Sequence, residues 1–140
     1  DRFPDRSRAA RAAVEAAMEM RQEMVRLAGE VDKPIGIGVV SGVVLAGIMG
    51  TPEVRQEFTV IGDTVNLASR LGDLALKLSA EGTIQKDYHG SHGGVMIEAG
   101  VKALIETSDR PELARLMRNL DLPPIKGKTR AVQAFFLPGF

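Results

Sequence analysis

The sequence contains no cysteine, so disulfides, thiolate catalysis and thiolate metal sites are all excluded. The absence of cysteine fits a reducing compartment. An excess of either charge is also missing, because 18 Lys and Arg residues balance 18 Asp and Glu residues. A neutral chain lacks the broad electrostatic attraction that draws proteins to nucleic acid or anionic lipid. We therefore expect no nucleic-acid partner.

Long apolar segments are lacking as well. The most apolar stretch, residues 35–50, is too short to span a bilayer comfortably and is interrupted by five glycines. The N-terminus is rich in Asp and Arg and does not resemble an apolar signal segment. We expect a soluble, cytoplasmic chain, with any membrane attachment made through domains outside these residues. Because the chain opens at Asp1 without an initiator Met, we also expect it to be a piece of a longer polypeptide.

The 140 residues suffice for one domain with a sizeable core. Apolar residues recur at helical spacing over residues 7–30, with charges on the opposite side, which predicts a long amphipathic helix. Gly29 and Pro34 bracket the end of this helix. Residues 35–50 predict two short buried strands that form a β-hairpin around Ser41 and Gly42.

The rest of the chain continues to alternate strands with helices. Residues 57–61 predict a strand, and the helix after Gly62 buries a stripe of leucines at positions 67, 71, 74 and 78. The remaining predicted elements are a loop at 86–94, a strand at 95–97, helices at 98–107 and 111–118, and an antiparallel pair of segments at 120–126 and 131–137. This order predicts an α+β fold in which helices pack on a sheet.

The most informative stretch is Thr-Val-Ile-Gly-Asp-Thr-Val-Asn-Leu-Ala-Ser-Arg, residues 59–70. It places Asn66 and Arg70 four residues apart on one face of the helix. Arg70 is a permanent cation with a forked set of donors, and Asn66 is a neutral donor and acceptor. Together they suit a phosphoryl group and the sugar that carries it. The alternative is structural: Asn66 caps the helix, and Arg70 pairs with Glu57 or Asp73.

Two glycine-containing motifs resemble nucleotide loops only superficially. Gly36 and Gly38 lack the third glycine and the following helix of a dinucleotide-binding motif, so they predict close approach between strands or between backbone and ligand. Gly127-Lys128-Thr129 resembles the end of a P-loop, but the glycine required at position 122 is replaced by Leu. Lys126 and Lys128 remain candidates to contact a phosphate as point charges, although lysines in a turn are usually only solvated.

Two long segments resemble the catalytic domain of the class III nucleotidyl cyclases. They are Ile-Gly-Ile-Gly-Val-Val-Ser-Gly-Val-Val-Leu-Ala-Gly-Ile-Met-Gly, residues 35–50, and Glu-Phe-Thr-Val-Ile-Gly-Asp-Thr-Val-Asn-Leu-Ala-Ser-Arg-Leu, residues 57–71. The resemblance extends back through residues 8–27 and forward through Gly-Gly-Val-Met-Ile-Glu at 93–98 and Pro-Ile-Lys-Gly-Lys-Thr at 124–129. It implies a ferredoxin-like antiparallel sheet with helices, here without its N-terminal strands. Residues 1–140 would form a single, partial catalytic domain.

This family converts a nucleoside triphosphate to a 3′,5′-cyclic monophosphate and pyrophosphate, with two divalent metal ions, Mg²⁺ or Mn²⁺. The resemblance implies that Asn66 orients the ribose and that Arg70 stabilises charge on the transferring phosphorus. One of the two lysines, Lys128 in preference to Lys126, would meet the terminal phosphates. Thr59 stands where the family selects the base. Asp is common there in mammalian-type adenylate cyclases and Thr in a bacterial-type subgroup, so the resemblance implies ATP as substrate.

The sequence departs from the family at the metal site. The two metal-binding aspartates of the family lie on strands before the first helix, in an Asp-Ile-x-Gly-Phe-like motif and a Gly-Asp hairpin turn, and neither motif is present. Asp1 and Asp5 lie too close to the helix, and Asp63 belongs to the other half of the site. We therefore expect no metal-binding residue in this chain, and we expect the chain alone to be inactive.

Family active sites lie at a dimer interface, so the resemblance implies a second cyclase subunit as partner, in a homodimer. Exposed strand edges and apolar helix surface also predict self-association. A further departure, the added stretch at residues 76–92, predicts either a dimerisation arm or a tolerated surface insertion. Three functions remain open: an adenylate cyclase domain, a guanylate cyclase domain, and a non-catalytic regulatory or dimerisation module with the cyclase fold.

Overall fold

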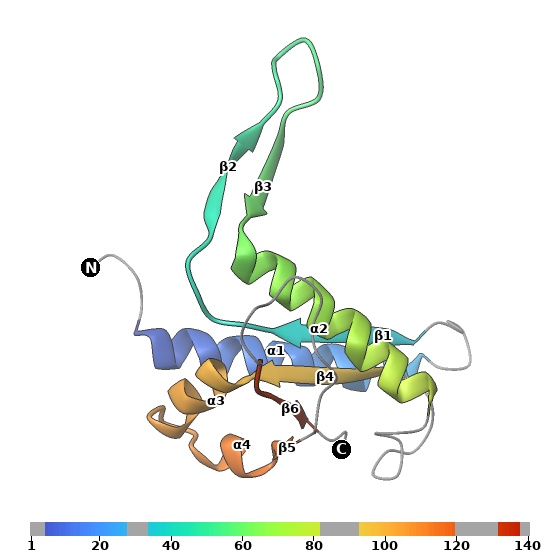
Figure 1. Cartoon of the computed structure of the whole chain (residues 1–140), viewed down its shortest axis with the longest axis vertical. Helices are drawn as coiled ribbons and strands as arrows, with labels where there is room; N and C mark the ends of the chain where they lie inside the picture. The colour runs from blue at the N-terminus through green and yellow to red at the C-terminus, as the bar shows by residue number, and fades with distance from the viewer. Residues whose placement is uncertain (1–4, 28–33, 82–92, 120–131, 138–140) are drawn as a thin grey trace.

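The computed structural model describes residues 5–27, 34–81, 93–119 and 132–137. Helices and strands alternate along the chain (Figure 1). The helices are α1 (Arg6–Arg26), α2 (Asp63–Ala80), α3 (Ala99–Glu106) and α4 (Glu112–Arg115). The strands are β1 (Ile35–Val39), β2 (Leu45–Met49), β3 (Glu57–Ile61), β4 (Gly93–Glu98), β5 (Arg118–Asn119) and β6 (Ala134–Leu137).

The main sheet has four strands in the order β1-β4-β6-β5. β1 runs parallel to β4, with Ile35 opposite Gly93 and Val39 opposite Ile97. β6 is antiparallel to both β4 and β5. The predicted α+β fold is confirmed, but the sheet is mixed rather than wholly antiparallel. Two parallel neighbours need a crossover connection, and the chain between β1 and β4 provides it through α2.

The predicted hairpin within residues 35–50 is wrong. β1 joins the main sheet beside β4, whereas β2 pairs with β3 in a separate two-stranded sheet. In that second sheet Leu45 lies opposite Ile61 and Met49 lies opposite Glu57. The Ser-Gly break therefore belongs to a link between two sheets rather than to a tight turn. β1 is partly buried, whereas β2 is mostly exposed, so the predicted burial of the second strand is also wrong.

Helices cover both faces of the main sheet, and the strand residues alternate between them (Figure 1). On one face the cluster packed under α1 and α3 contains Ala10, Val14, Ala17, Val95, Ile97, Val101, Ile105, Leu113, Ala114, Met117, Phe135 and Leu137. On the other face the cluster under α2 contains Leu67, Leu71, Ala75, Met96, Ala134 and Phe136. The sheet is therefore the middle layer of three, and α2 alone forms the layer that carries the candidate site.

Most predicted element boundaries agree with the structure to within a few residues. α1 begins one residue before the predicted helix, and Asp5 caps it by accepting a 3.0 Å hydrogen bond from the Ser7 backbone N–H. The predicted strand at 95–97 extends to Gly93 and Glu98, so the end of the predicted loop at 86–94 belongs to β4. The strand at 131–137 is confirmed as β6, but its described partners are β4 and β5. The segment predicted as its partner, 120–126, lies outside the described residues.

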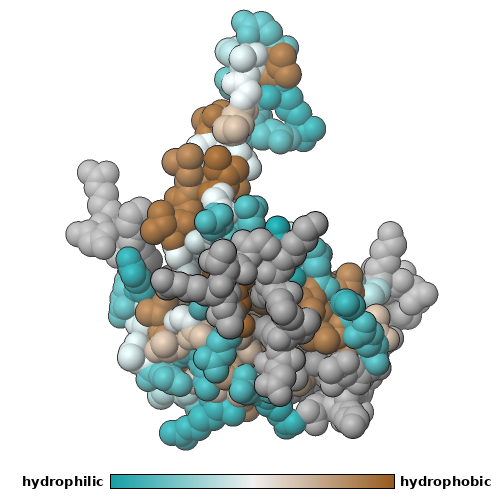
Figure 2. Space-filling model, in the orientation of Figure 1, coloured by the Kyte–Doolittle hydropathy of each residue, from teal (hydrophilic) through white to brown (hydrophobic). Residues whose placement is uncertain are grey.

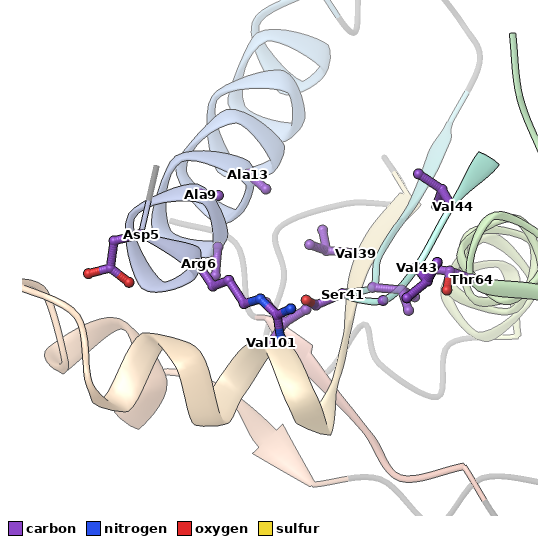
Figure 3. A pocket seen from close by; sticks show the side chains of 13 residues that line it. Asp5, Arg6, Ala9, Ala13, Val39, Ser41, Val43, Val44, Thr64 and Val101 are labelled. Carbon is purple, nitrogen blue, oxygen red and sulfur yellow. The ribbon is translucent and has the colours of Figure 1, made fainter. Parts of the chain in front are cut away.

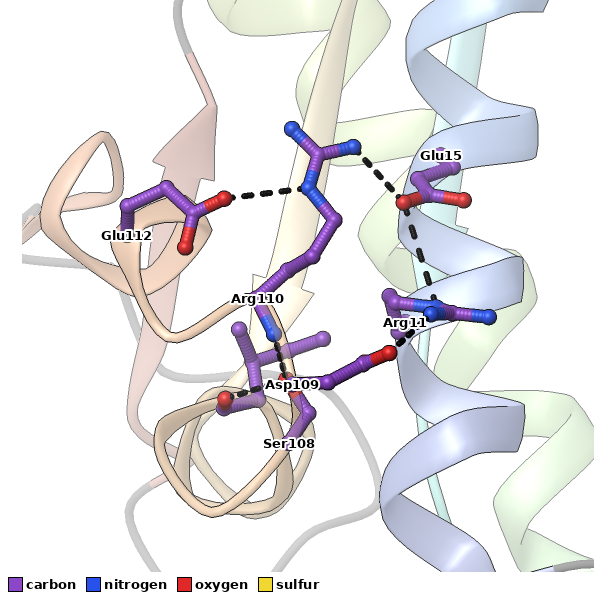
Figure 4. Close-up of polar contacts among 7 residues, drawn as sticks. Arg11, Glu15, Ser108, Asp109, Arg110 and Glu112 are labelled. Atoms are coloured by element: carbon purple, nitrogen blue, oxygen red, sulfur yellow. Dashed lines mark hydrogen bonds and ion pairs between the residues drawn. The ribbon is translucent and has the colours of Figure 1, made fainter.

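A network of exposed ion pairs joins α1 to the segment between α3 and α4 (Figure 4). Arg11 Nη1 lies 2.6 Å from Asp109 Oδ2, and Arg110 Nη1 lies 2.8 Å from Glu15 Oε1. Hydrogen bonds to Glu112 and then to Glu15 raise the pKa of Arg110, so this guanidinium stays charged. Each exposed pair contributes little free energy, but together they hold α3 and α4 against the helix on the face opposite α2.

Candidate functional site

Helix α2 presents Asn66 and Arg70 on its exposed side. The helix begins after Gly62, whose φ of +134° lies in a region that favours glycine. No side chain caps this start, and the Asn66 backbone N–H donates the first helical hydrogen bond, 3.0 Å long, to the Gly62 carbonyl oxygen. The predicted core stripe is confirmed at Leu67 and Leu71, which are buried. Asn66 and Arg70 lie beside that stripe and are exposed.

Glycines set the position of α2 over β1. A Cβ atom on Gly36 would overlap the carbonyl oxygen of Gly72, and a Cβ atom on Gly38 would overlap that of Ala68. The predicted close approach at Gly36 and Gly38 is therefore confirmed, but the neighbour is a helix rather than a strand or a ligand. Because backbone meets backbone, no side chain can adjust to relieve the contact. The backbone of β1 therefore fixes the distance between α2 and the sheet, and with it the position of the side chains that α2 exposes.

The structural alternatives for Asn66 and Arg70 are not found. Glu57 pairs instead with Arg55, at 2.7 Å between Oε1 and Nε. Across the described parts of the chain, Arg70 forms no ion pair and the Asn66 side chain makes no hydrogen bond. A guanidinium and a carboxamide four residues apart on one helix face are thus available to an external partner. Their donors suit an anionic, oxygen-rich ligand.

Thr59 lies on β3, in the two-stranded sheet that leads into α2. It is half-buried, and it stands directly opposite Gly47 on β2. A pocket of about 220 Å³ occupies this face of the sheet, with a lining of Leu45, Ala46, Gly47, Met49, Thr59 and Ile61. The Thr59 hydroxyl has no hydrogen-bond partner anywhere in the described residues. The site thus combines an apolar hollow with one free hydroxyl.

The two lysines predicted to contact phosphate, Lys126 and Lys128, lie outside the described residues. Their proposed role stays a prediction. Of the residues predicted from the sequence, the structure therefore places three: Thr59 on β3, and Asn66 and Arg70 on the helix that follows it. Six residues separate Thr59 from Asn66, and only Gly62 separates the strand from the helix.

A larger cavity, of about 810 Å³, opens where the N-terminal end of α1 faces the exit of β1 (Figure 3). Its lining is mostly apolar, and Val101 of α3 closes one side. Arg6 extends its guanidinium toward Ser41 and Val101, while Thr64 lies at the other end (Figure 3). Sequence reasoning did not find this cavity, because its walls come from segments far apart in the chain. Asn66 and Arg70 do not line it.

The family resemblance implies two divalent metal ions for the active site. Within them, no group of three or more His, Cys, Asp and Glu side chains lies close enough to hold a metal ion. The carboxylate of Asp5 is occupied in capping α1, and its hydrogen bonds with Ser7 lower its pKa. Asp63 lies in the first turn of α2.

The β-arm, which we define as β2, β3 and their connecting turn (residues 45–61), projects from the body and exposes apolar side chains (Figure 1). Phe58 is 74% exposed and Ile48 is 69% exposed, and they lie opposite each other. Figure 2 shows the apolar surface of the β-arm in brown, below a more polar tip. A two-stranded sheet is marginally stable in water unless other elements pack on it. The exposed apolar side chains of the β-arm are therefore typical of a surface that binds another protein.

None of the helices in the described residues is long and apolar enough to cross a membrane.

Comparison with known proteins identifies the relatives of the chain. Human adenylate cyclase type 10 is 44% identical over 57 residues, which are 39% of this chain and 4% of that protein. The crystal structure of the adenylyl cyclase CyaB from P. aeruginosa is similar with a TM-score of 0.65 and 26% identity, covering 93% of this chain and 59% of that chain. The chain thus spans only part of the length of either relative.

The family model described as the adenylate and guanylate cyclase catalytic domain matches residues 3–83. This range includes α1, β1, the β-arm and α2, and so it contains Thr59, Asn66 and Arg70. It covers more than half of the 140 residues. The resemblance inferred from the sequence is confirmed: the chain belongs to the adenylate and guanylate cyclase catalytic domain family.

Proposed function

We propose that this chain supplies the nucleotide-orienting half of an adenylate cyclase active site, which converts ATP to 3′,5′-cyclic AMP and pyrophosphate in intracellular signalling. In this reaction the ribose 3′ oxygen forms a bond to the α-phosphorus, and the bond from that phosphorus to the bridging oxygen of the β-phosphate breaks. Pyrophosphate leaves with the bonding electrons, and the hydroxyl proton is released.

The availability of Asn66 and Arg70 is the observation that carries this proposal. Both side chains are exposed on one face of α2, and neither is engaged by another described residue. Phosphoryl transfer depends mainly on positioning and charge stabilisation. A carboxamide suits the ribose, and a permanently charged, planar donor suits the transferring phosphoryl group. The close backbone packing of α2 on β1 would hold the side chains of Asn66 and Arg70 in place.

ATP is the proposed substrate in preference to GTP. The support is Thr59, at the position where the family selects the base, and the fact that both similar proteins named above are adenylyl cyclases. The free hydroxyl of Thr59 can donate to one ring nitrogen or accept from an amino group. Binding of non-cyclisable ATP and GTP analogues, compared side by side, tests this preference.

A second cyclase subunit is proposed as the partner, because the described residues contain no cluster of three or more side chains that could hold the divalent ions of the family. When bound, those ions neutralise the phosphates, and carboxylates of the partner would hold them. The exposed apolar surface of the β-arm supports such a partner. In this proposal the chain alone does not turn over, and the paired subunits do.

A complementation assay tests the proposal. The chain is mixed with an active cyclase subunit that keeps its metal-binding carboxylates but has its own Asn and Arg replaced by Ala. We expect no cyclic AMP from either component alone and clear production from the mixture. Arg70→Ala in this chain is expected to lower the rate of the mixture by about 10²–10³, the usual cost of one aimed donor.

The matched control is Arg115→Ala, which removes an exposed cation from α4, a helix of the α1 and α3 face. Its rate in the mixture should equal that of the wild-type chain. An unchanged rate for Arg70→Ala would remove Arg70 from the proposed role. Cyclic AMP production by the lone chain would refute the division of the site between two subunits.

A non-catalytic cyclase-homology module is the second candidate. The absence of a metal cluster from the described residues and the apolar β-arm are both compatible with a domain that only associates. A module of this kind would pair with the complementing subunit but would bind no ATP analogue. An Asn and an Arg that no other described residue engages favour the enzyme.

A further inference from the structure

The cross-strand pair formed by Gly47 and Thr59 has an unusual hollow on one side. Residues directly opposite on antiparallel strands share a face, so Thr59 projects beside the position where Gly47 has no side chain. A Cβ atom built on Gly47 would meet nothing within 4 Å. By contrast, the same atom on Gly36, Gly38 or Gly50 would collide with backbone.

Neither packing nor backbone conformation therefore requires glycine at position 47. Its φ is not positive, in contrast to that of Gly50 and Gly62. Glycine in a strand interior weakens the strand, and Val would be preferred there. The glycine therefore lowers the stability of the exposed hairpin and leaves open space beside Thr59.

The empty space is part of the pocket of about 220 Å³ on this face of the β-arm. Complete ligand sites usually measure about 300–1,000 Å³, so the pocket fits one part of a larger ligand. Leu45, Met49 and Ile61 give it apolar walls, and Thr59 gives it one hydroxyl without a partner. Such a combination fits a flat heteroaromatic ring that has apolar faces and a polar edge.

The two faces of the β-arm differ in a way that agrees with this assignment. The opposite face carries Ile48, Phe58 and Val60, whose exposed apolar side chains suit contact with another protein. The face of Gly47 is hollow instead, and it continues along β3 through Ile61 into the start of α2. A ring held beside Thr59 would therefore be attached to a sugar and phosphates that extend toward Asn66 and Arg70.

We propose that Gly47 is a specificity-determining residue whose missing side chain admits the nucleobase of the nucleoside triphosphate beside Thr59. This inference rests on the proposed function, because the ligand is the substrate of the same site. In this proposal β2 forms one wall of the base pocket. No functional residue was predicted on that strand from the sequence.

The test uses Gly47→Ala and Gly47→Val in the complementation assay. The measured quantities are the KM for ATP and the inhibition constant of inorganic tripolyphosphate, which has no base. Added methyl groups in the pocket should raise the KM by about 10- to 200-fold for Val, with a smaller rise for Ala. The inhibition constant of tripolyphosphate should stay unchanged, because the phosphates bind elsewhere.

Val25→Ile is the matched control, since it adds one carbon to an exposed side chain of α1, away from the β-arm. It should leave the KM unchanged. The thermal unfolding midpoint of Gly47→Val should be equal to or above that of wild type, because the new side chain enters open space in a strand.

The outcomes separate this inference from the proposed function. A wild-type KM for Gly47→Val in an active mixture overturns the inference and leaves the proposed function intact. A parallel rise in the KM and in the tripolyphosphate constant also overturns it, because that result indicates general distortion. No cyclic AMP from the wild-type mixture overturns the proposed function and, with it, the inference.

Discussion

Arg21 of α1 donates a 3.2 Å hydrogen bond from its Nε atom to the carbonyl oxygen of Gly93 at the start of β4. The two residues are 72 positions apart, and Arg21 is only 4% exposed. A guanidinium that has been removed from water needs such a partner. The contact therefore fixes the C-terminal half of α1 to the first residue of the central strand pair.

Replacing Arg21 by Leu should reduce the free energy of unfolding by about 1–3 kcal/mol, because the Gly93 carbonyl loses a charged donor. Urea denaturation followed by circular dichroism measures this change. Arg8→Leu, on the exposed side of the same helix, is the control and should change the unfolding free energy by less than about 0.5 kcal/mol. Equal midpoints for the two variants would contradict the structural role of the buried contact.

Gly36→Ala should destabilise the protein, since the new Cβ atom overlaps the Gly72 carbonyl oxygen and must push α2 away from β1. Overpacking of this kind costs about 1–3 kcal/mol. Gly47→Ala makes the same chemical change in open space and should not lower the unfolding midpoint. Thermal unfolding of the two variants in parallel measures this difference. An equal fall of the unfolding midpoint in both variants would show that the close packing of α2 on β1 does not cause the destabilisation.

Phe58→Glu should weaken self-association through the β-arm and leave the body folded. The Phe58 ring is mostly exposed, so a charge there costs little in the isolated chain but must be buried in an interface. Sedimentation velocity over a range of concentrations measures the association, and circular dichroism checks the fold. Wild-type chain that stays monomeric at the highest concentration would contradict the role assigned to this surface.

The cap of α1 predicts a pH dependence. Hydrogen bonds with Ser7 lower the pKa of Asp5 below the usual value of 3.8, so the folded state favours the ionised carboxylate. The stabilisation is present above pH 3.8 and is lost as the pH falls through the lower, folded-state pKa. Unfolding midpoints of wild type and Asp5→Ala should differ near neutral pH and converge in acid. A difference that persists unchanged in acid would show that the cap does not depend on the charge.

The sequence predicted α2 accurately because its signals are local. The leucines at helical spacing identified the buried side, and this placed Asn66 and Arg70 on the exposed side without knowledge of the fold. The family motif added Thr59, which the structure places on the strand that enters the helix.

The pairing of β1 could not be predicted in the same way. An apolar strand pattern predicts burial of residues 35–39, which are partly buried, but it does not show which strand lies beside them, and the true partner is about 60 residues further along the chain. Local reasoning chose the nearest apolar segment and produced a hairpin that does not exist. The hollow at Gly47 was invisible for a similar reason, since it depends on the residue opposite and not on the neighbours in sequence.

The two ends of the β-arm meet beside α2. A Cβ atom on Gly62 would lie 3.7 Å from the Val43 carbonyl oxygen, so the chain returns close to the point from which it left. The β-arm is consequently an insertion in the crossover between β1 and α2, and the chain leaves and re-enters the body at nearly the same point. Its length can vary without moving either element, and a shortened chain that rejoins the two ends should still assemble the three-layered body.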